Sequence, residues 1–322
     1  MRAVRFDRYG DYDVLEVAEV PRPEPGPGEL LVQVRAAGVN PFDNSVRAGK
    51  IPQVKPPAIP GNEGMGVVVA GEGVPAGTRV MLAGPFGFGR PGTWQEFVAA
   101  SPSDVRLVPE SLSDVEAAAV PVAYQAAQLA LIHGCTFVPG MTLLIPGVGG
   151  AVANAAIQLA GAQGAGRVIT SAGSAAKAAR AAELGYADVI DLSSEPLSDG
   201  VRRLTDGKGV DVALDTIGGP ITGEALASVG RGGLVVVMGY TAGTTPTIDS
   251  MNLIWRGARL IGFNGVFQPP AAFDEAWSVI LRLLAGGRVK PLIDRTYRLE
   301  EAAEACRHLA EDRPLGKVVL TI

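Results

Sequence analysis

The sequence predicts an α/β protein in which a β-rich unit is joined to a doubly wound parallel sheet. Short β-branched segments separated by glycine and proline turns fill residues 1–120. Strand segments then alternate with helical segments over residues 121–262. The length of 322 residues is enough for two domains with substantial cores.

The β-rich unit is expected to begin with a pair of strands. Residues 1–20 alternate charged and apolar side chains, and they lack the apolar core of a signal peptide. Further strands are expected at 30–34, 66–70, 79–82 and 96–99. Links rich in glycine or proline, such as 21–28 and 84–92, separate these strands. The pattern indicates a compact, barrel-like β unit.

Strand and helix segments alternate over residues 121–262, which predicts a parallel sheet with helices on both faces. Helices are expected at 151–162 and 175–184. Buried strands are expected at 142–145, 167–170, 189–191, 210–214 and 234–238.

The tail after residue 262 does not continue this series. It contains two expected helices, 273–285 and 300–310, and a closing strand at 317–321. We therefore expect residues 263–322 to fold back onto the first unit.

Composition excludes several classes of function. The formal net charge is −5 and no basic block is present, which disfavours a nucleic-acid partner. No uninterrupted apolar stretch approaches the roughly eighteen residues of a membrane span. The two cysteines, Cys135 and Cys306, are too few for a disulfide framework or a four-cysteine zinc lobe. We expect a cytoplasmic protein that does not bind membranes.

The strongest chemical signal is TLLIPGVGGAVA at residues 142–153, where an apolar strand enters a glycine-rich turn that opens into a helix. Such a Rossmann-type turn binds a dinucleotide diphosphate through free N–H groups at the helix start. Gly147 permits the tight turn, Val152 replaces the third glycine of the strict pattern, and small side chains allow the helix to pack closely on the strand. The expected cofactor contacts are Gly147, Gly149, Gly150, Ala151 and Val152. The alternative is a glycine-rich turn that binds nothing.

Two later glycine-containing segments follow strands in the same region. DTIGG at residues 215–219 and VMGY at residues 237–240 place Gly218 and Gly239 where a nicotinamide would lie.

The segment after the second strand favours NADPH over NADH. An NAD-specific fold usually places Asp or Glu there to accept from the ribose 2′-hydroxyl, yet no acidic residue lies between Met141 and Ala182. Ser171, Ser174 and Lys177 are expected to supply the donors and positive charge that a 2′-phosphate needs. The alternative for Lys177 is an exposed helix face.

Five segments give the chain a resemblance to a known family. They are AGVNPFD (37–43), PGNEGMGV (60–67), GTWQEFV (92–98), the turn at 147–153 and LGKVV (315–319). In this order and spacing they resemble the medium-chain dehydrogenase/reductase superfamily, and specifically its zinc-independent quinone oxidoreductase branch. The resemblance implies a GroES-like catalytic domain at 1–120 and 263–322, an inserted Rossmann NADP-binding domain at 121–262, and an active site in the cleft between them.

The resemblance also bears on metal binding. Zinc-dependent relatives have Cys where this chain has Asn40 and His where it has Asn62. Zinc prefers thiolate, imidazole and carboxylate ligands, so we expect no metal. A cluster of His133, Cys135 and His308 is a disfavoured alternative.

Several positions differ from the branch. Ser45 and Ile51 stand where tyrosines are common, Ala126 where a threonine contacts the cofactor, and Leu192 where a tyrosine supports the 2′-phosphate. These differences weaken the case for a quinone substrate and for NADP.

Without zinc, the hydride acceptor must already be electrophilic, as a quinone or an α,β-unsaturated carbonyl is. The expected catalytic residues are Asn40, which orients nicotinamide or substrate, and Tyr240, which flanks the nicotinamide or donates a hydrogen bond. Their alternatives are a turn before Pro41 and simple packing. Lys317 is expected to contact the cofactor, or else to be a solvated charge. Trp94 and Phe86 are candidates to line the substrate pocket, with core packing as the alternative.

Three functions remain open at this stage. The first is an NADPH-dependent reductase of a quinone or enone, expected as a homodimer formed through the edge of the Rossmann sheet. The second is a zinc-free reductase of another small acceptor. The third is a catalytically silent NADPH-binding protein. Two histidines do not supply a convincing Ser-His-Asp set, so hydrolysis is disfavoured.

Overall fold

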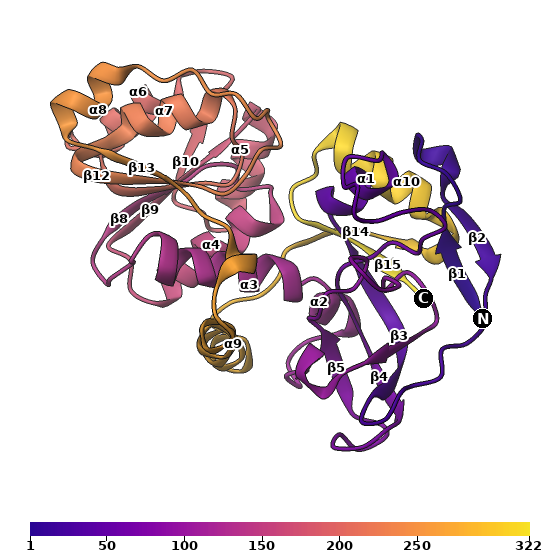
Figure 1. The fold of residues 1–322 in the computed structure, drawn as a ribbon. Coiled ribbons are helices and arrows are strands. Elements are labelled where there is room, and N and C mark those ends of the chain that lie inside the picture. The colour runs from indigo at the N-terminus through magenta and orange to yellow at the C-terminus, as the bar shows by residue number, and fades with distance from the viewer. The chain divides into compact units, whose positions relative to one another are not determined.

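The computed structural model describes residues 1–322, which form two compact units. Residues 1–123 and 290–322 form the β-rich unit, and residues 124–289 form the parallel-sheet unit. Figure 1 shows the first and last parts of the chain, indigo and yellow, combined in the β-rich unit.

A seven-stranded sheet organises the β-rich unit in the order β14-β15-β3-β4-β5-β7, with β6 beside β3. Its strands are β3 (Leu30–Val39), β4 (Gly64–Ala70), β5 (Arg79–Leu82), β6 (Phe97–Ala100), β7 (Val105–Leu107), β14 (Ile293–Arg298) and β15 (Lys317–Thr321). All four internal strands expected from sequence are present. The closing strand β15 pairs antiparallel with β3, so the end of the tail does fold back onto the first unit.

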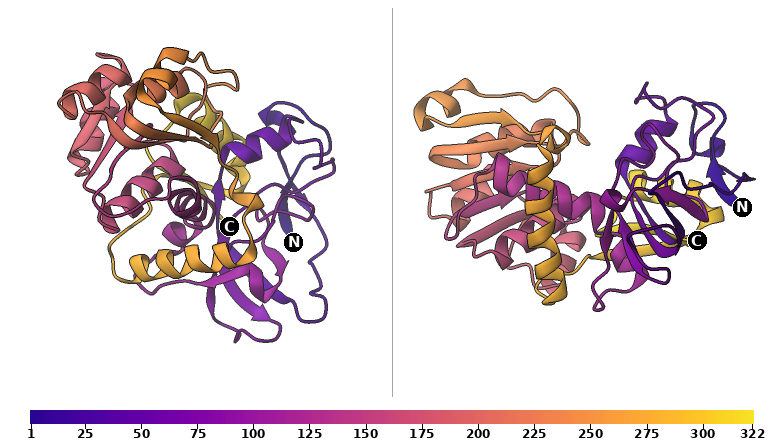
Figure 2. Two further views of the ribbon diagram at one scale, coloured as in Figure 1. Left: turned by 60° about the vertical axis from the view of Figure 1, so that its left-hand side comes forward. Right: turned by 60° about the horizontal axis from the view of Figure 1, so that its bottom comes forward.

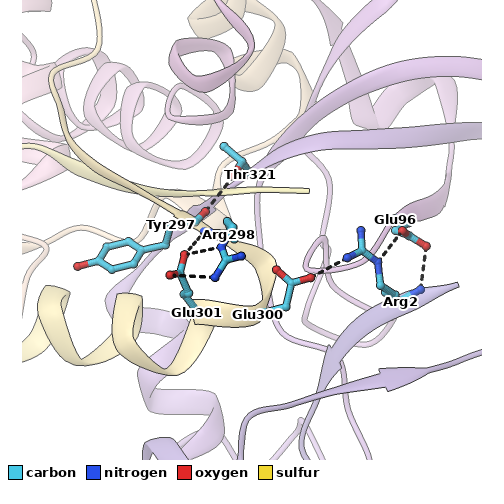
Figure 3. A network of polar contacts seen from close by, with 7 residues as sticks. All are labelled: Arg2, Glu96, Tyr297, Arg298, Glu300, Glu301 and Thr321. Atoms are coloured by element: carbon cyan, nitrogen blue, oxygen red, sulfur yellow. Dashed lines mark hydrogen bonds and ion pairs between the residues drawn. The ribbon is translucent and has the colours of Figure 1, made fainter.

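The first twenty residues form the expected strand pair, β1 (Arg2–Arg5) against β2 (Glu16–Glu19). Surface charge links this pair to distant segments of the same unit. Arg2 contacts Glu96 at 2.9 Å and Glu300 at 2.6 Å, and Arg298 pairs with Glu301 close by (Figure 3). These side chains are substantially exposed, so the ion pairs add little to stability.

Short helices complete the β-rich unit. They are η1 (Tyr12–Val14), α1 (Pro41–Arg47), η2 (Pro102–Asp104), α2 (Asp114–Ala118), η5 (Leu299–Glu301), α10 (Ala302–Arg307) and η6 (His308–Asp312). The single helix expected at 300–310 is therefore divided into three geometries. Helix α3 (Pro121–Leu129) spans the boundary between the two units.

Alternating apolar side chains explain the core of the β-rich unit. Leu30, Val32 and Val34 on β3 pack against residues of β4, β5 and β6. Trp94 and Phe86 are also completely or almost completely buried. The prediction that these two aromatics line a substrate pocket is therefore wrong, because both belong to the core.

The parallel-sheet unit has six strands in the order β10-β9-β8-β11-β12-β13, and every pair is parallel. The strands are β8 (Thr142–Ile145), β9 (Arg167–Ala172), β10 (Asp188–Asp191), β11 (Val210–Asp215), β12 (Val229–Val237) and β13 (Arg259–Gly262). The chain leaves β8 toward β9 and β10, and later returns to the other side of β8 as β11. The point between β8 and β11 is thus the topological switch, where such sheets bind ligands at the carboxyl ends of their strands.

Helices cover both faces of this sheet (Figures 1 and 2). They are α4 (Ala151–Ala162), α5 (Ala175–Glu183), α6 (Leu197–Leu204), α7 (Pro220–Ser228), α8 (Ser250–Arg256) and α9 (Pro270–Ala285), with the shorter η3 (Ala130–Gly134) and η4 (Gly265–Phe267). Helices α6, α7 and α8 are neighbours, and α9 contacts α4.

The domain boundary expected at residue 262 differs from that of the structure. Helix α9 belongs to the parallel-sheet unit, which continues to residue 289. The physical reason is its apolar face, because Ala272 and Ala276 pack against Leu129 of α3. The alternation of strands and helices in the sequence does not reveal a final helix that packs against earlier helices of the same unit.

Candidate active site

The glycine-rich turn connects β8 to α4 at the topological switch. Gly147 has φ +84°, a left-handed conformation that favours glycine. A Cβ placed on Gly147 would lie 2.8 Å from Cδ1 of Ile217, so the end of that side chain would have to shift. The N–H of Val148 donates to the Ser171 carbonyl at 2.9 Å, which fixes the turn to β9.

The start of α4 presents unpaired backbone N–H groups. The N-cap, Gly150, provides no side-chain hydrogen bond, and the first turn contains no acidic residue. The bond from the Asn154 N–H to the Gly150 carbonyl, 2.8 Å, is the first of the helical series. The N–H groups of Ala151, Val152 and Ala153 therefore precede any intrahelical acceptor. Together with the helix dipole they make a cradle for an anion.

Packing between two loops places the later glycines beside each other. A Cβ on Gly239 would lie 1.9 Å from the Thr216 carbonyl oxygen, and one on Gly218 would lie 2.4 Å from the Gly239 carbonyl oxygen. The loops after β11 and β12 thus meet backbone to backbone, which requires glycine at both positions. Their contact with a nicotinamide remains a prediction.

A buried carboxylate that the sequence analysis did not single out holds the loop after β11. Asp215 accepts hydrogen bonds from the N–H groups of Ile217 and Gly218, both at 2.9 Å, and from the Thr222 hydroxyl. An Asp at the end of a strand, immediately before a Thr-Ile-Gly-Gly turn, is the signal that could have indicated this role.

The expected 2′-phosphate residues have different surroundings. Ser174 is the N-cap of α5 and accepts from the Lys177 N–H at 3.4 Å, and both residues are partly exposed. Ser171, in contrast, is fully buried, and its Oγ accepts from the Gly147 N–H at 3.2 Å. The prediction that Ser171 offers a free hydroxyl to the cofactor is corrected accordingly, because this hydroxyl supports the glycine-rich turn.

The β-rich unit contains a buried polar network around Glu63 and Lys317, whose side chains are 0% and 3% exposed. Lys317 Nζ forms an ion pair with Glu63 Oε1 and donates to Asn40 Oδ1. The Asn40 amide in turn donates to Glu63 Oε1 and to Asn62 Oδ1, each at 2.7 Å. The Val122 N–H donates to Glu63 Oε2 at 2.7 Å.

Local structure explains how these side chains meet. Asn40 follows β3 directly and Lys317 begins β15, and these two strands are paired in the sheet. Gly38 leaves room for the carboxylate, because a Cβ there would lie 2.3 Å from Glu63 Oε1. With each charged atom hydrogen-bonded, the buried pair is compensated for its loss of hydration.

Asp43 lies next to this network and is also buried. It accepts from the Asn40 N–H at 2.8 Å and from the Gly61 N–H at 3.1 Å. Burial raises the pKa of its carboxyl to about 7, despite these hydrogen bonds and the nearby Lys317 charge. Both hydrogen bonds order the turn that begins α1.

The network does not suit a zinc ion. Its members are two amides, a carboxylate and an ammonium, and the ammonium occupies the carboxylate. Across the chain, no three His, Cys, Asp or Glu side chains come together as a metal site would need. His133 instead faces Glu275 at 4.0 Å in the parallel-sheet unit.

The predicted site residues Tyr240, Asn40 and Lys317 differ in how far their side chains are exposed. Tyr240 lies after β12 and is 58% exposed. Asn40 is almost fully buried and both N–H bonds of its amide are engaged. Lys317 is buried as well, so the alternative of a solvated terminal charge is wrong. Its contact with the cofactor remains a prediction.

Comparison with known proteins places this geometry in a family. Residues 26–110 match the family model described as the alcohol dehydrogenase GroES-like domain. Residues 151–282 match the one described as zinc-binding dehydrogenase. Quinone oxidoreductase-like protein 2 from Rattus norvegicus is 32% identical over 317 residues, which cover 96% of this chain and 89% of that protein. The chain belongs to the medium-chain dehydrogenase/reductase superfamily, in its quinone oxidoreductase branch.

Solved members of the superfamily have the same fold. A structure described as an NAD-dependent alcohol dehydrogenase is 32% identical with a TM-score of 0.90, and a mycobacterial protein solved in complex with NADPH is 28% identical with a TM-score of 0.86. Each comparison covers 100% of both chains. The chain has no helix whose length and hydropathy would suit a bilayer crossing.

Proposed function

We propose that the chain is an NADPH-dependent oxidoreductase that reduces a quinone or an α,β-unsaturated carbonyl by hydride transfer, without a metal. The observation that carries the proposal is the uncapped start of α4 at the topological switch. Its free N–H groups suit the diphosphate of a dinucleotide, and membership in the quinone oxidoreductase branch supports the choice of acceptor.

The region after β9 supports NADPH as the dinucleotide. Ser174 and Lys177 begin α5 in the position where a 2′-phosphate would need donors and positive charge. The segment that follows β9 in the sequence contains no acidic residue to accept from a 2′-hydroxyl or to repel a phosphate, and the nearest carboxylate in the sheet is Asp191, paired with Ala172 at the end of neighbouring β10. The similar mycobacterial structure contains NADPH, and the similar alcohol dehydrogenase is described as NAD-dependent, so cofactor choice is a primary test.

The protein's part in the reaction is to bind the dinucleotide and to orient and stabilise the acceptor. The dinucleotide, when bound, supplies the hydride. The N–H groups of Ala151 and Val152 would hold its diphosphate, and Gly218 and Gly239, packed backbone to backbone, would lie against its nicotinamide ring. Tyr240 follows Gly239 in the same loop, is 58% exposed, and would flank the ring. Asn40 and Asn62 stand where zinc-dependent relatives have metal ligands, so polarisation of the acceptor comes from hydrogen bonds.

Two further features of the protein follow from the same proposal. We propose a homodimer formed through β13, because this edge strand has a partner on one side only and is followed by exposed Val266 and Phe267. We place the protein in the cytoplasm, since its two buried cysteines are free thiols, as is usual in reducing compartments.

The loss of reduced-nicotinamide absorbance, measured with a panel of quinones and enones, tests the activity. Turnover with any of these acceptors supports the proposal. NADPH binding without turnover across the panel would instead identify a binding protein.

Cofactor choice is tested by Lys177→Ala. Loss of a charge-assisted contact to phosphate should weaken NADPH binding by about tenfold, or ~1.4 kcal/mol, and leave NADH binding nearly unchanged. Lys208→Ala, which removes an exposed lysine from the loop before β11, is the control and should alter neither affinity. Equal losses for NADPH and NADH in the Lys177 variant would overturn the phosphate assignment.

A further inference from the structure

A hollow of about 420 Å³ lies at the amino-end edge of the parallel sheet, wholly within the unit of residues 124–289. It is lined by the first residues of β8, β11 and β13, by the early part of β12, and by the segment that follows η3. The start of α4 lies beyond the carboxyl end of β8, at the opposite edge of the same sheet. Because β8 has four residues, about 13 Å of strand separates the two edges. The hollow is therefore a feature distinct from the expected diphosphate site.

Close contact between two glycines brings two cations to this hollow. A Cβ on Gly209 would lie 2.7 Å from the Gly230 nitrogen, and a Cβ on Gly230 would lie 2.7 Å from the Lys208 carbonyl oxygen. The loop before β11 and the start of β12 thus touch backbone to backbone. Lys208 and Arg231, each next to one of these glycines in sequence, both line the hollow.

The pairing of β12 adds a third cation. Val210 pairs with Val229 and Val212 with Leu234, so four residues of β12 stand opposite a single residue of β11. Such a bulge takes the extra residues out of the ladder. Leu234, where regular pairing resumes, is also paired with Arg259 at the start of β13. Arg259 is thereby held on the lining of the same hollow.

The charges on this lining are unbalanced. Lys208, Arg231 and Arg259 are exposed, and none of them makes an ion pair or a side-chain hydrogen bond within the chain. The lining contains one carboxylate, Asp211, which accepts from the Thr142 N–H at 2.7 Å. Positive charge is thus in local excess in a chain whose formal net charge is −5. Like charges on adjoining strands repel one another, and a bound anion would remove that repulsion.

The size and the apolar part of the lining indicate the kind of anion. A volume of about 420 Å³ is typical of sites for small organic molecules and exceeds what a lone phosphate ion fills. Val210, Val212, Leu234 and Cys135 contribute buried apolar surface. Arginine guanidinium groups bind phosphate oxygens in a bidentate manner. A phosphate group attached to a small apolar body matches both parts of the lining.

We infer that this hollow binds a small phosphate monoester. Arg231, Arg259 and Lys208 hold the phosphate, and the organic group covers the apolar surface at Val212 and Leu234. The inference does not depend on the proposed function, because the hollow and the start of α4 lie at opposite edges of the sheet.

Phenyl phosphate is a suitable probe, and isothermal titration calorimetry measures its affinity. Arg231→Ala and Arg259→Ala should each weaken binding about tenfold, because each removes a charge-assisted contact. Wild-type affinity should fall as salt is added. Inorganic phosphate should bind about tenfold more weakly than phenyl phosphate, because it lacks a ring to cover the apolar surface.

A matched control is available on α9. Arg282 is an exposed arginine of the same unit that does not line the hollow and has no ion pair, so Arg282→Ala removes an equal charge elsewhere. It should bind phenyl phosphate as the wild type does. Thermal unfolding without ligand should be nearly the same for all three variants, since the changed side chains are exposed.

Saturating NADPH should leave phenyl phosphate binding unchanged. Displacement of phenyl phosphate by NADPH would place the phosphate at the dinucleotide site and overturn the inference. Equal affinity in the wild type and in the Arg231 and Arg259 variants, or an equal loss in Arg282→Ala, would also overturn it. Inorganic phosphate that binds as tightly as phenyl phosphate would overturn the assignment of a monoester. A protein that binds phenyl phosphate in this way and does not bind NADPH would refute the proposed function and leave this inference standing.

Discussion

The buried ion pair of Lys317 and Glu63 joins two distant parts of the chain and surrounds the Asn40 amide. Lys317 bonds to Asn40 across a sequence separation of 277 residues. Removing one partner of such a buried pair typically costs about 3–5 kcal/mol, since the other charge is left uncompensated. The same pair sets the orientation of the Asn40 amide, because the Lys317 ammonium donates to its oxygen and the Glu63 carboxylate accepts from its nitrogen.

Asp43 gives this region a dependence on pH. Its pKa in the folded protein is raised to about 7, above the ordinary 3.8. A raised pKa means that the folded state binds more protons between these values. The contribution of Asp43 to stability is therefore complete below about pH 4 and is lost as the pH rises to about 7.

Asp43→Asn tests whether the contribution of Asp43 to the free energy of unfolding falls as the pH rises. The variant lacks the titrating proton and carries a constant penalty, because an amide cannot accept from both the Asn40 and the Gly61 N–H groups. Unfolding free energies from urea titrations should show the advantage of wild type over the variant shrinking from about pH 4 to about pH 7. Parallel profiles would show that Asp43 does not titrate in this range.

At the scale of elements, the start of α4 combines two opposing demands. A helix N-terminus is most stable with an Asp, Asn or Ser at the N-cap, whereas a diphosphate needs that position free of negative charge. Gly150 has φ −73° and ψ 136°, angles that any residue can adopt, and ordinary van der Waals space for a Cβ. The absence of a cap here is therefore not imposed by backbone geometry.

Gly150→Asp should therefore raise the stability of the unliganded protein and lower its affinity for NADPH. We expect the unliganded protein to gain about 0.5–1 kcal/mol of unfolding free energy from the cap and the helix dipole. NADPH affinity should fall at least about tenfold, because the carboxylate repels the diphosphate. Gly150→Asn is the control, since it supplies a cap without charge and should bind NADPH better than the Asp variant. Unchanged NADPH affinity in Gly150→Asp would place the diphosphate elsewhere.

Elements with strong local signals could be predicted from the sequence, and long-range contacts could not. The strand at 142–145 and the helix at 151–162 have the predicted bounds, because glycine and the change of hydrophobic period mark their ends. The strand expected at 30–34 continues to Val39, since both of its faces are buried and alternation disappears. The hydrogen bond that Ser171 Oγ accepts from the Gly147 N–H, and the one that Asn62 Oδ1 accepts from Asn40, join residues that no local pattern connects.

At the scale of the whole molecule, both ends of the chain contribute to one unit. Strands β14 and β15 complete the sheet that β3 begins. In the sequence, the parallel-sheet unit (residues 124–289) lies between the first part of this sheet and β14. In the second unit β13 is an edge strand that pairs with β12 on one side only. Native proteins cover, charge or pair such edges, which supports self-association there.

Phe267→Asp tests the proposed homodimer. Phe267 is 82% exposed and follows β13, so a charge there should weaken an apolar interface and shift the protein from dimer to monomer in sedimentation velocity. Leu107→Asp changes a residue 61% exposed in the β-rich unit and should leave the dimer intact. A wild-type protein that sediments as a monomer would refute the homodimer.

NADPH titration of the wild-type protein tests the central claim most directly. If the diphosphate binds the open start of α4, saturating NADPH should stabilise the folded chain by ~2.7 kcal/mol at a concentration of 100 times Kd, seen as a higher unfolding temperature. Tryptophan emission should be quenched over the same range of concentration. A chain whose unfolding temperature and emission are both unchanged by saturating NADPH would contradict the account.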